Sequence, residues 1–402
     1  MATPQIDSSH ETNIHDEPPE RPIVPFSEET PDLLRGLLES KEPPIPTFSE
    51  ALDDNLNGGL RRKALIGIAG LPGNGKTTFA WQLAQHIAEH GKTVAAHQVP
   101  VPCLYVSLEL SKPTLYHKAL SRIGRIDGGV LSSRRWVTEP DVEEKDRILK
   151  DIVKANTRFN RIARHLGVLD MTQAVPGRMT IEQLRENAST FLESYRAHLE
   201  LELMRGAPDP GERERLSYAL EQDPHLVIFV DHLQLLSAQP DASRDGALPH
   251  DAIISYHLKH LAVSIDCTVV ALSQMTTAEA DPVVQGADMT AVLRTGYKLI
   301  DEKIKDLAKE TKEMASEDAA PQEREEIEKE RTEHEKVRSQ KPLQTEGSPI
   351  YAILDIEKNR DGKTRHALFV WRRAFHEFEE VKEETEDVDF PRSLMRFLTR
   401  EG

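Results

Sequence analysis

The sequence has few of the features that mark secreted, membrane-spanning or metal-binding proteins. Only two of its 402 residues are cysteines, which is too few for a disulfide framework or a cysteine-based metal site. No apolar run approaches the length of a membrane span, and residues 1–25 lack the apolar segment of a signal peptide. We therefore expect a cytoplasmic protein without a membrane partner.

Aromatic residues are also scarce, at 5%, whereas charged residues make up 30% of the chain. The net charge of −17 is concentrated in residues 1–60, 301–346 and 377–402, which carry −10, −5 and −5. The remainder of the chain carries about +3 and is nearly neutral. Net charge therefore neither excludes a nucleic-acid partner nor argues for one.

The strongest functional signal lies at residues 70–78, between the apolar run 64–69 and a helix-like segment that starts at Phe79. The stretch fits the pattern G-x-x-x-x-G-K-[ST] of a phosphate-binding loop. Glycines let backbone N–H groups turn inward around phosphate oxygens, and the following helix N-terminus adds its positive end. We expect nucleotide binding by Gly70, Pro72, Gly73, Asn74, Gly75, Lys76, Thr77 and Thr78.

Two side chains of this loop have specific expected roles. Lys76 should reach the β- and γ-phosphates, and the Thr77 hydroxyl should coordinate Mg²⁺. The sequence therefore predicts ATP and Mg²⁺ as cofactors.

Short apolar runs alternate with helical segments along the rest of the chain. Runs of four to seven apolar residues separated by helices indicate a parallel sheet covered on both faces, an α/β fold. We expect strands near 102–108, 167–170, 225–231, 267–272, 350–357 and 367–371, and helices near 79–89, 113–123, 142–166, 179–199 and 253–262.

Composition divides the chain into segments. Residues 1–44 are acidic and proline-rich and should be disordered, apart from one short amphipathic helix that starts at Phe26. The ATPase core should occupy 45–298 and 347–376, interrupted by a charged helical insertion at 299–346 and followed by an acidic tail at 377–402. The helices at 299–341 are interpreted as a solvated projection, with a partner-binding coiled coil as the alternative.

Four further sites complete the expected catalytic machinery. Asp231 ends a buried strand, as a Mg²⁺-binding acid should, and Glu109 ends the strand that follows the loop helix. Gln274 ends another strand and could sense the γ-phosphate. Lys358 and Arg360 could reach the nucleotide of a neighbouring subunit. The alternatives are an exposed strand-end acid for Glu109 and a solvated basic turn for Lys358 and Arg360.

The ordered motifs resemble the C-terminal motor domain of DnaB-type replicative helicases, which belong to the RecA/KaiC-like ATPases. The resemblance covers roughly residues 44–376. It is carried by Pro46-Thr47-Phe48, Leu52-Asp53, Gly58-Gly59-Leu60, Gly70 to Thr78, Ser107-Leu108-Glu109-Leu110-Ser111, Asp231-His232-Leu233-Gln234-Leu235, Ser273-Gln274 and Lys358-Asn359-Arg360-Asp361-Gly362.

The resemblance implies a RecA-like sheet and ATP hydrolysis at the subunit interfaces of a ring, usually a hexamer, that translocates on single-stranded DNA. It assigns phosphate and metal contacts to Lys76, Thr77 and Asp231, and the catalytic base to Glu109. It also makes Gln274 the γ-phosphate sensor, with Lys358 and Arg360 as the contacts from a neighbouring subunit.

The sequence departs from the helicase pattern in three respects, one of which is that the expected DNA-facing region has few basic residues. The N-terminal helical domain of the family is missing, and the expected acid and strand after Leu293-Arg294-Thr295-Gly296 are replaced by charged helices. Arg294 and Lys298 are the named candidates for DNA contact. The preferred function is a single-strand DNA motor. The alternative is a regulatory ATPase whose nucleotide state controls assembly with protein partners.

Overall fold

A computed structural model describes two separate units, one within residues 1–42 and one within 43–402. The described residues are 25–39, 42–94, 97–138, 141–173, 179–206, 210–221, 223–237, 249–276, 284–295 and 350–382. The expected disordered segment before Pro25, the charged insertion 299–346 and most of the acidic tail lie outside these residues.

The first unit contributes one described helix, α1 (Phe26–Glu39). Two glutamates in its first turn complement the positive end of the helix. Large apolar side chains on α1 are exposed, namely Phe26, Leu33, Leu34 and Leu38. The short amphipathic helix expected from the sequence is therefore confirmed.

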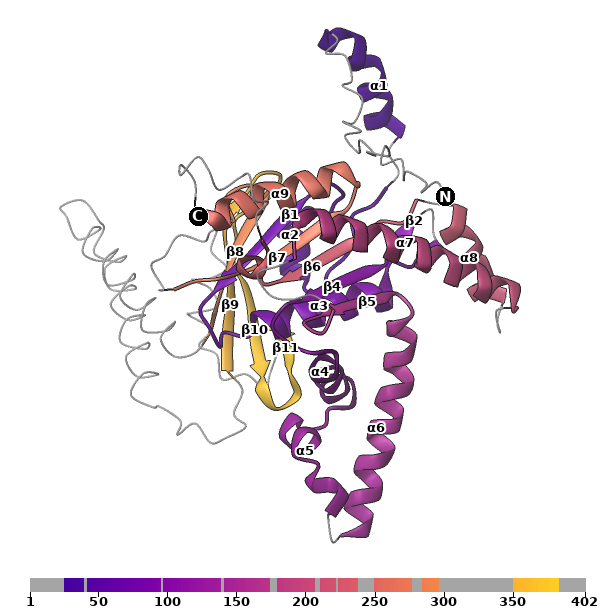
Figure 1. Ribbon diagram of the computed structural model, residues 1–402, viewed down its shortest axis with the longest axis vertical. Coiled ribbons are helices and arrows are strands. Elements are labelled where there is room, and N and C mark those ends of the chain that lie inside the picture. Colours follow the sequence, from indigo (N-terminus) through magenta and orange to yellow (C-terminus); the bar gives the residue numbers. More distant parts are fainter. Residues whose placement is uncertain are drawn as a thin grey trace, which may run out of the picture. The chain divides into compact units, whose positions relative to one another are not determined.

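The second unit is built on a nine-stranded sheet, shown in Figure 1, with the order β11-β10-β9-β8-β1-β7-β6-β4-β5. The six strands from β8 to β5 are parallel, whereas β9, β10 and β11 are antiparallel. The parallel strands are β1 (Leu65–Gly70), β4 (Cys103–Ser107), β5 (Leu166–Asp170), β6 (Val227–Asp231), β7 (Thr268–Gln274) and β8 (Met289–Thr295). The antiparallel strands are β9 (Ile350–Asn359), β10 (Ala367–Arg372) and β11 (Glu377–Glu380). The expected α/β fold is confirmed, and the sheet is mixed because its last three strands are antiparallel.

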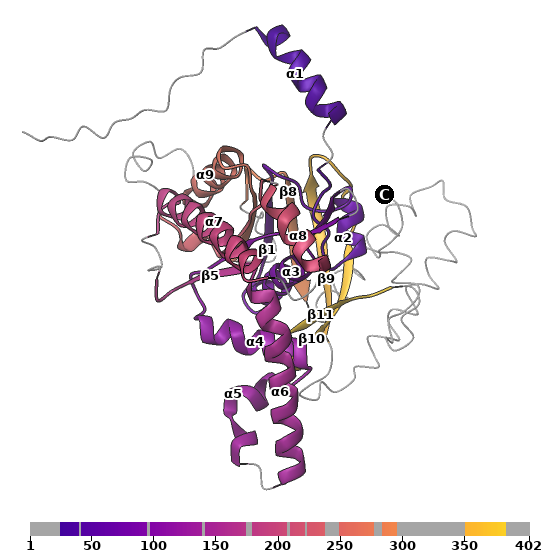
Figure 2. The same cartoon turned by 90° about the vertical axis from the view of Figure 1, so that its right-hand side faces the viewer.

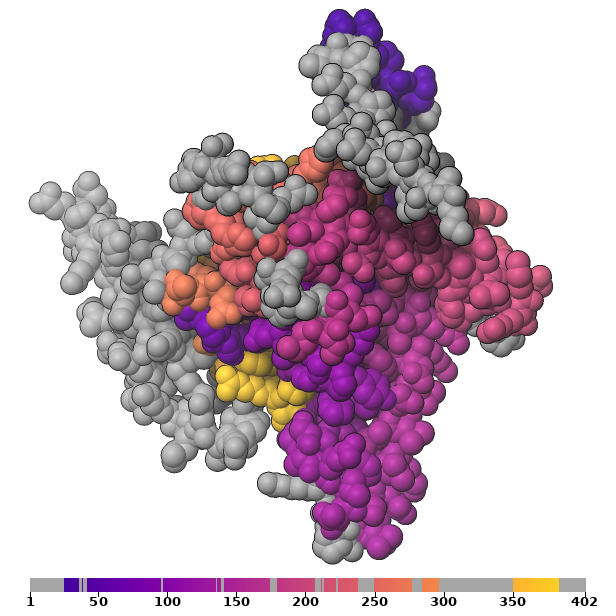
Figure 3. Space-filling model, viewed as in Figure 1, coloured from indigo at the N-terminus to yellow at the C-terminus, as the bar shows by residue number. Residues whose placement is uncertain are grey.

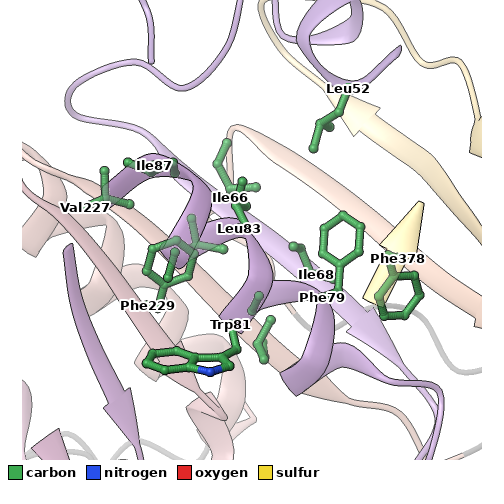
Figure 4. Close-up of a cluster of buried hydrophobic side chains, with 14 of the residues drawn as sticks. Leu52, Ile66, Ile68, Phe79, Trp81, Leu83, Ile87, Val227, Phe229 and Phe378 are labelled. Atoms are coloured by element: carbon green, nitrogen blue, oxygen red, sulfur yellow. The ribbon is translucent and has the colours of Figure 1, made fainter. Parts of the chain in front are cut away.

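Helices cover both faces of this sheet, which explains why the parallel strands are apolar at successive positions. Within β6, Val227 and Phe229 pack into the core beneath α3 (Lys76–His90), whereas Ile228 and Val230 pack into the core on the other face. Figure 4 shows side chains of the first core, including Phe79, Trp81 and Phe229. The second core includes residues of α7 (Ile181–Met204) and α9 (His250–Ser264).

Three further helices form an arm on the α3 side of the sheet, seen in Figure 2. They are α4 (Lys112–Gly124), α5 (Gly128–Ser133) and α6 (Val142–Ala163), and they share a small core that includes Leu120, Leu131 and Ala155. The two short helices α2 (Glu50–Asn55) and α8 (Pro210–Glu221) and the hairpin β2 (Lys92–Val94) and β3 (His97–Val99) complete the unit, with 3-10 turns at 135–138, 233–235 and 373–375. No helix in the described part of the chain is long and apolar enough to cross a membrane.

The charged stretch after residue 200 is mostly helical where the structure describes it, at 201–206 and 210–221. It contains the end of α7 and the whole of α8. Leu216 and Ala219 of α8 are buried against Tyr195 and Leu199 of α7. The i,i+3 spacing of the two apolar residues places them on one helix face, so α8 packs despite its charged composition.

Two strands of the large sheet were absent from the sequence interpretation. Strand β8 lies between β1 and β9, and its polar residues Thr290, Arg294 and Thr295 hide the apolar pattern. Strand β11 lies within the expected tail 377–402 and has one apolar residue, Phe378, which is 1% exposed. The core therefore continues past the expected boundary at residue 376, to at least Glu380.

Removal of the Phe378 ring tests whether β11 belongs to the core. The ring lies 5.2 Å from that of Trp371 and also contacts Phe79. Phe378→Ala should lower the free energy of unfolding by about 3–5 kcal/mol, as measured by urea denaturation. Lys382→Ala, which removes a surface ion pair with Glu50, should cost at most about 1 kcal/mol. Equal unfolding midpoints for the two variants would place β11 outside the core.

Candidate nucleotide-binding site

The phosphate-binding loop connects the end of β1 to the start of α3. Gly73 and Gly75 have φ angles of 80° and 83°, a region that L-residues with a Cβ rarely adopt. A Cβ at Gly75 would also lie 3.0 Å or less from Trp371 and Phe378. Glycine is therefore needed at position 75 both for the turn and for the close packing of β10 and β11 against the loop.

The Lys76 side chain folds back over this loop. Its Nζ donates to the carbonyl oxygens of Gly70 (2.7 Å) and Leu71 (3.0 Å). Burial lowers the pKa of Lys76, and the negative charges of Asp231 and Glu109 oppose this shift. The Lys76 side chain is thus held at the loop, and the carboxylates of Asp231 and Glu109 are close enough to influence its pKa.

Asn74 fastens the loop to the neighbouring strand β8. Its Nδ2 donates to the carbonyl oxygen of Leu293 (3.0 Å), and its Oδ1 accepts from the Thr295 hydroxyl (3.1 Å). A Cβ at Gly70 would lie 2.7 Å from the same Leu293 carbonyl oxygen. The unexpected strand β8 therefore supports the loop directly.

Asp231 lies at the carboxyl end of β6 and is 2% exposed. Its carboxylate accepts hydrogen bonds from the Tyr105 Oη (3.0 Å) and from the Thr77 side chain. Burial raises the pKa of Asp231, and these two hydrogen bonds oppose the rise. The structure thus brings together the two expected Mg²⁺ ligands, Thr77 and Asp231.

The oxygen donors at this position fit the implied metal. Mg²⁺ prefers oxygen ligands and is usually held by one or two protein groups together with substrate phosphates. The hydroxyl of Thr77 and the carboxylate of Asp231 provide such a pair beside the loop. When bound, the metal would neutralise charge on the phosphates.

Tyr105 is a site residue that sequence reasoning missed. It lies in the middle of β4, is fully buried, and also lies 3.4 Å from the backbone oxygen of Thr77. The sequence did contain a signal for this residue. Tyr105 places a hydroxyl group among the apolar residues of a predicted buried strand, where it needs a hydrogen-bond partner.

Glu109 follows β4 and has an exposed side chain. The preceding turn is fixed because the Leu108 N–H donates to the Asp231 carbonyl oxygen (2.9 Å) and the Leu110 N–H donates to the Ser107 Oγ (3.2 Å). Glu109 therefore lies at the same sheet edge as Asp231, with its carboxylate open to solvent. Such a carboxylate has access to a water molecule.

Gln274 is the last residue of β7 and pairs in register with Gly70 of β1. Its backbone N–H donates to the Gln234 Oε1 (3.2 Å), while the Gln234 Nε2 donates to the Ser273 Oγ (3.0 Å). Gln234, a second residue that sequence reasoning missed, thus fixes the backbone that carries the exposed Gln274 side chain.

A further cation near the loop comes from α4. The Lys118 Nζ lies 3.5 Å from the Thr78 Oγ1 and 3.4 Å from the His376 Nδ1. Burial lowers the pKa of Lys118, and Asp231 opposes the shift. Lys118 adds positive charge next to the loop.

Lys358 and Arg360 lie near the amino end of β1, at the opposite end of this strand from the loop. The Arg360 N–H donates to the Asp288 carbonyl oxygen (2.9 Å), and the Asp288 side chain accepts from the N–H of Leu65, the first residue of β1. The loop follows the other end of this strand, about 17 Å away by strand geometry. The structure thus separates Lys358 and Arg360 from the loop of their own chain.

Of the two expected DNA contacts, Arg294 is described and Lys298 lies outside the described residues. Arg294 pairs with two carboxylates of β9, those of Asp355 (3.5 Å) and Glu357 (3.1 Å). The guanidinium therefore already has anionic partners within the sheet.

Comparisons with known proteins found similar sequences and similar folds. Residues 45–204 match the family model described as the DnaB-like helicase C-terminal domain. A probable replicative DNA helicase of Trieres chinensis is 23% identical over 56% of this chain, and the replicative DNA helicase DnaB of Nostoc sp. is 25% identical over 58%. The chain spans only 38% and 20% of the length of these two relatives.

Two solved structures share the fold. The first, a separately solved ATPase domain, superposes with a TM-score of 0.54 at 15% identity, covering 90% of this chain and all of that domain. A DnaB-like replicative helicase, solved to describe its interactions with primase, gives a TM-score of 0.52 at 16% identity, covering 90% of this chain and 68% of that one. At this level of identity the similarity establishes the fold alone.

The hydroxyl of Tyr105 offers a direct test of the metal position. Tyr105→Phe removes one of the two hydrogen bonds that orient Asp231, so the Mg²⁺ concentration for half-maximal binding of fluorescent ADP should rise about tenfold. Tyr116→Phe, which removes the hydrogen bond from another tyrosine to Asn156 (2.8 Å), is the matched control and should leave it unchanged. Identical Mg²⁺ dependence in the two variants would show that Tyr105 does not orient the ligand.

Proposed function

We propose that the chain is an ATP-driven motor, because residues 45–204 match the family model described as the DnaB-like helicase C-terminal domain. It couples Mg²⁺-dependent ATP hydrolysis to movement along single-stranded DNA and to unwinding of the duplex. The observation that carries the proposal is the convergence of Lys76, Asp231, Glu109 and Gln274 at the ends of four adjacent strands, β1, β6, β4 and β7.

The chemical step assigns one role to each of these groups. Glu109 accepts a proton from a water molecule, whose oxygen then attacks the γ-phosphorus as the bond to the ADP oxygen breaks. Lys76 stabilises the charge that develops on the phosphate oxygens, and Gln274 donates a hydrogen bond to the γ-phosphate. Thr77 and Asp231 would hold the Mg²⁺, which would neutralise charge on the phosphates.

The separation of Arg360 from its own loop supports a shared site between subunits. A nucleotide bound at one loop would receive Lys358 and Arg360 from the next copy, which stabilise the transition state from outside. This arrangement requires an oligomer, and we propose the ring, usually a hexamer, that the family resemblance implies.

DNA contact remains part of this proposal. We propose that Arg294 and Lys298 contact phosphates of the strand, for which Arg294 must exchange its ion pairs with Asp355 and Glu357. A protein partner at residues 299–341 also stays a proposal. The two buried free thiols, Cys103 and Cys267, suit a reducing compartment, and we place the motor in the cytoplasm.

ATP turnover with and without single-stranded DNA tests the motor. Native turnover should rise several-fold with DNA and fall back with added salt. Lys76→Ala and Glu109→Gln should each lose at least a hundredfold in turnover, and the Glu109 variant should still bind ATP. Turnover that ignores DNA and RNA would contradict the motor and favour a regulatory ATPase.

Mixing two inactive variants tests the shared site. Arg360→Ala and Lys76→Ala should each lack turnover, but one half of the site is intact in each chain. After co-assembly, some interfaces combine the intact loop of an Arg360→Ala subunit with the intact Arg360 of a Lys76→Ala subunit. These interfaces should regain turnover. In an equal random mixture they make up about a quarter of all interfaces. A mixture as inactive as its parts, despite confirmed co-assembly, would argue against the contact between subunits.

A further inference from the structure

A hollow of about 740 Å³ lies at the amino ends of the parallel strands β4 and β5. Its walls include Pro100, which precedes β4, and His165, which precedes β5, whereas the phosphate-binding loop follows the carboxyl end of β1. The sheet end of α6 and the start of α8, neighbours in Figure 3, complete the walls. This hollow is therefore separate from the nucleotide site.

Three arginines line the hollow, in a protein whose net charge is −17. Arg161 and Arg164 come from the end of α6, and Arg215 comes from α8. Basic residues at a helix C-terminus complement its dipole, which accounts for the two from α6. That explanation does not extend to Arg215, which reaches the same hollow from a different helix.

The two acids that line the hollow already have partners. Glu89 accepts two hydrogen bonds from the Arg158 guanidinium, at 2.7 and 3.1 Å. Glu202 pairs with Arg164 (3.5 Å) and lies 3.4 Å from the His198 Nε2. The two carboxylates therefore pair with Arg158, which lies outside the lining, and with Arg164. The other two arginines of the lining have no carboxylate partner among them.

Arg161 and Arg215 are those two arginines. Arg215 donates from Nε to the Gln98 carbonyl oxygen (3.1 Å), which orients the rest of its fork. In the described part of the chain, neither arginine has a carboxylate within 4 Å. His165, fixed by a 2.9 Å contact between its Nδ1 and the Tyr195 Oη, has its pKa lowered to about 4 by burial and the nearby arginines, so it lines the hollow as a neutral polar group.

We propose that this hollow binds a phosphate-bearing anion with about two negative charges, held by the guanidinium groups of Arg161 and Arg215. Guanidinium forks match the oxygens of phosphate in bidentate geometry, and two uncompensated cations balance a dianion. The phosphate belongs either to a small molecule or to the backbone of a nucleic-acid strand. The site goes beyond the proposed motor and does not require ATP turnover.

The test uses the full chain carrying Lys76→Ala, so that the phosphate-binding loop does not compete. Inorganic pyrophosphate is titrated by calorimetry, and a fluorescent twelve-residue oligothymidylate is titrated by anisotropy. Adding Arg161→Gln and Arg215→Gln should weaken binding of one or both probes at least tenfold. The matched control, Lys150→Gln with Lys154→Gln, removes two exposed charges from α6 outside the hollow and should leave both affinities unchanged.

The two probes distinguish the sources of the phosphate. A loss confined to pyrophosphate identifies a small phosphorylated ligand, and a loss with the oligonucleotide identifies a nucleic-acid strand. The proposal would be overturned if neither probe binds, or if the glutamine variant binds both probes as tightly as the control does. If the glutamine variant fails to fold, Arg161→Lys with Arg215→Lys keeps the charge but loses the forks, and unchanged affinities in this variant would likewise overturn it.

Discussion

The buried carboxylate of Asp231 ties three separate parts of the chain together. A charge that is 2% exposed is tolerated only when donors satisfy it, and here the donors come from Thr77 at the start of α3 and Tyr105 in β4. The loop, the loop helix and the two strands β4 and β6 are therefore fixed relative to one another. The placement of Glu109 follows, because the turn after β4 hydrogen-bonds to the Asp231 backbone.

The parallel sheet separates two charged regions at its opposite edges. Phosphate chemistry is assigned to the carboxyl ends of β1, β4, β6 and β7, where the loop and the carboxylates meet. The amino edge carries Arg360 beside Asp288 and the hollow with Arg161 and Arg215. If both proposals hold, the sheet carries the nucleotide at the carboxyl ends of its parallel strands and a second anion at their amino ends.

Most of the fold and the central site could be predicted from the sequence, because both depend on strong local patterns. Continuous apolar runs identified β1, β4, β6 and β7, and the loop motif identified Lys76 and Thr77. Strands β8 and β11 were missed because the first is partly polar and the second contributes one apolar side chain, Phe378. Tyr105 and Gln234 were missed because their roles depend on contacts between strands that are distant in sequence.

Displacement of streptavidin from a biotinylated single-stranded oligonucleotide tests the central claim most directly, because it requires force along the strand. With ATP and Mg²⁺, the native protein should displace streptavidin from one end of the oligonucleotide faster than from the other. The Lys76→Ala protein should displace it from neither. ATP turnover without displacement from either end would contradict the account of this chain as a motor on single-stranded DNA.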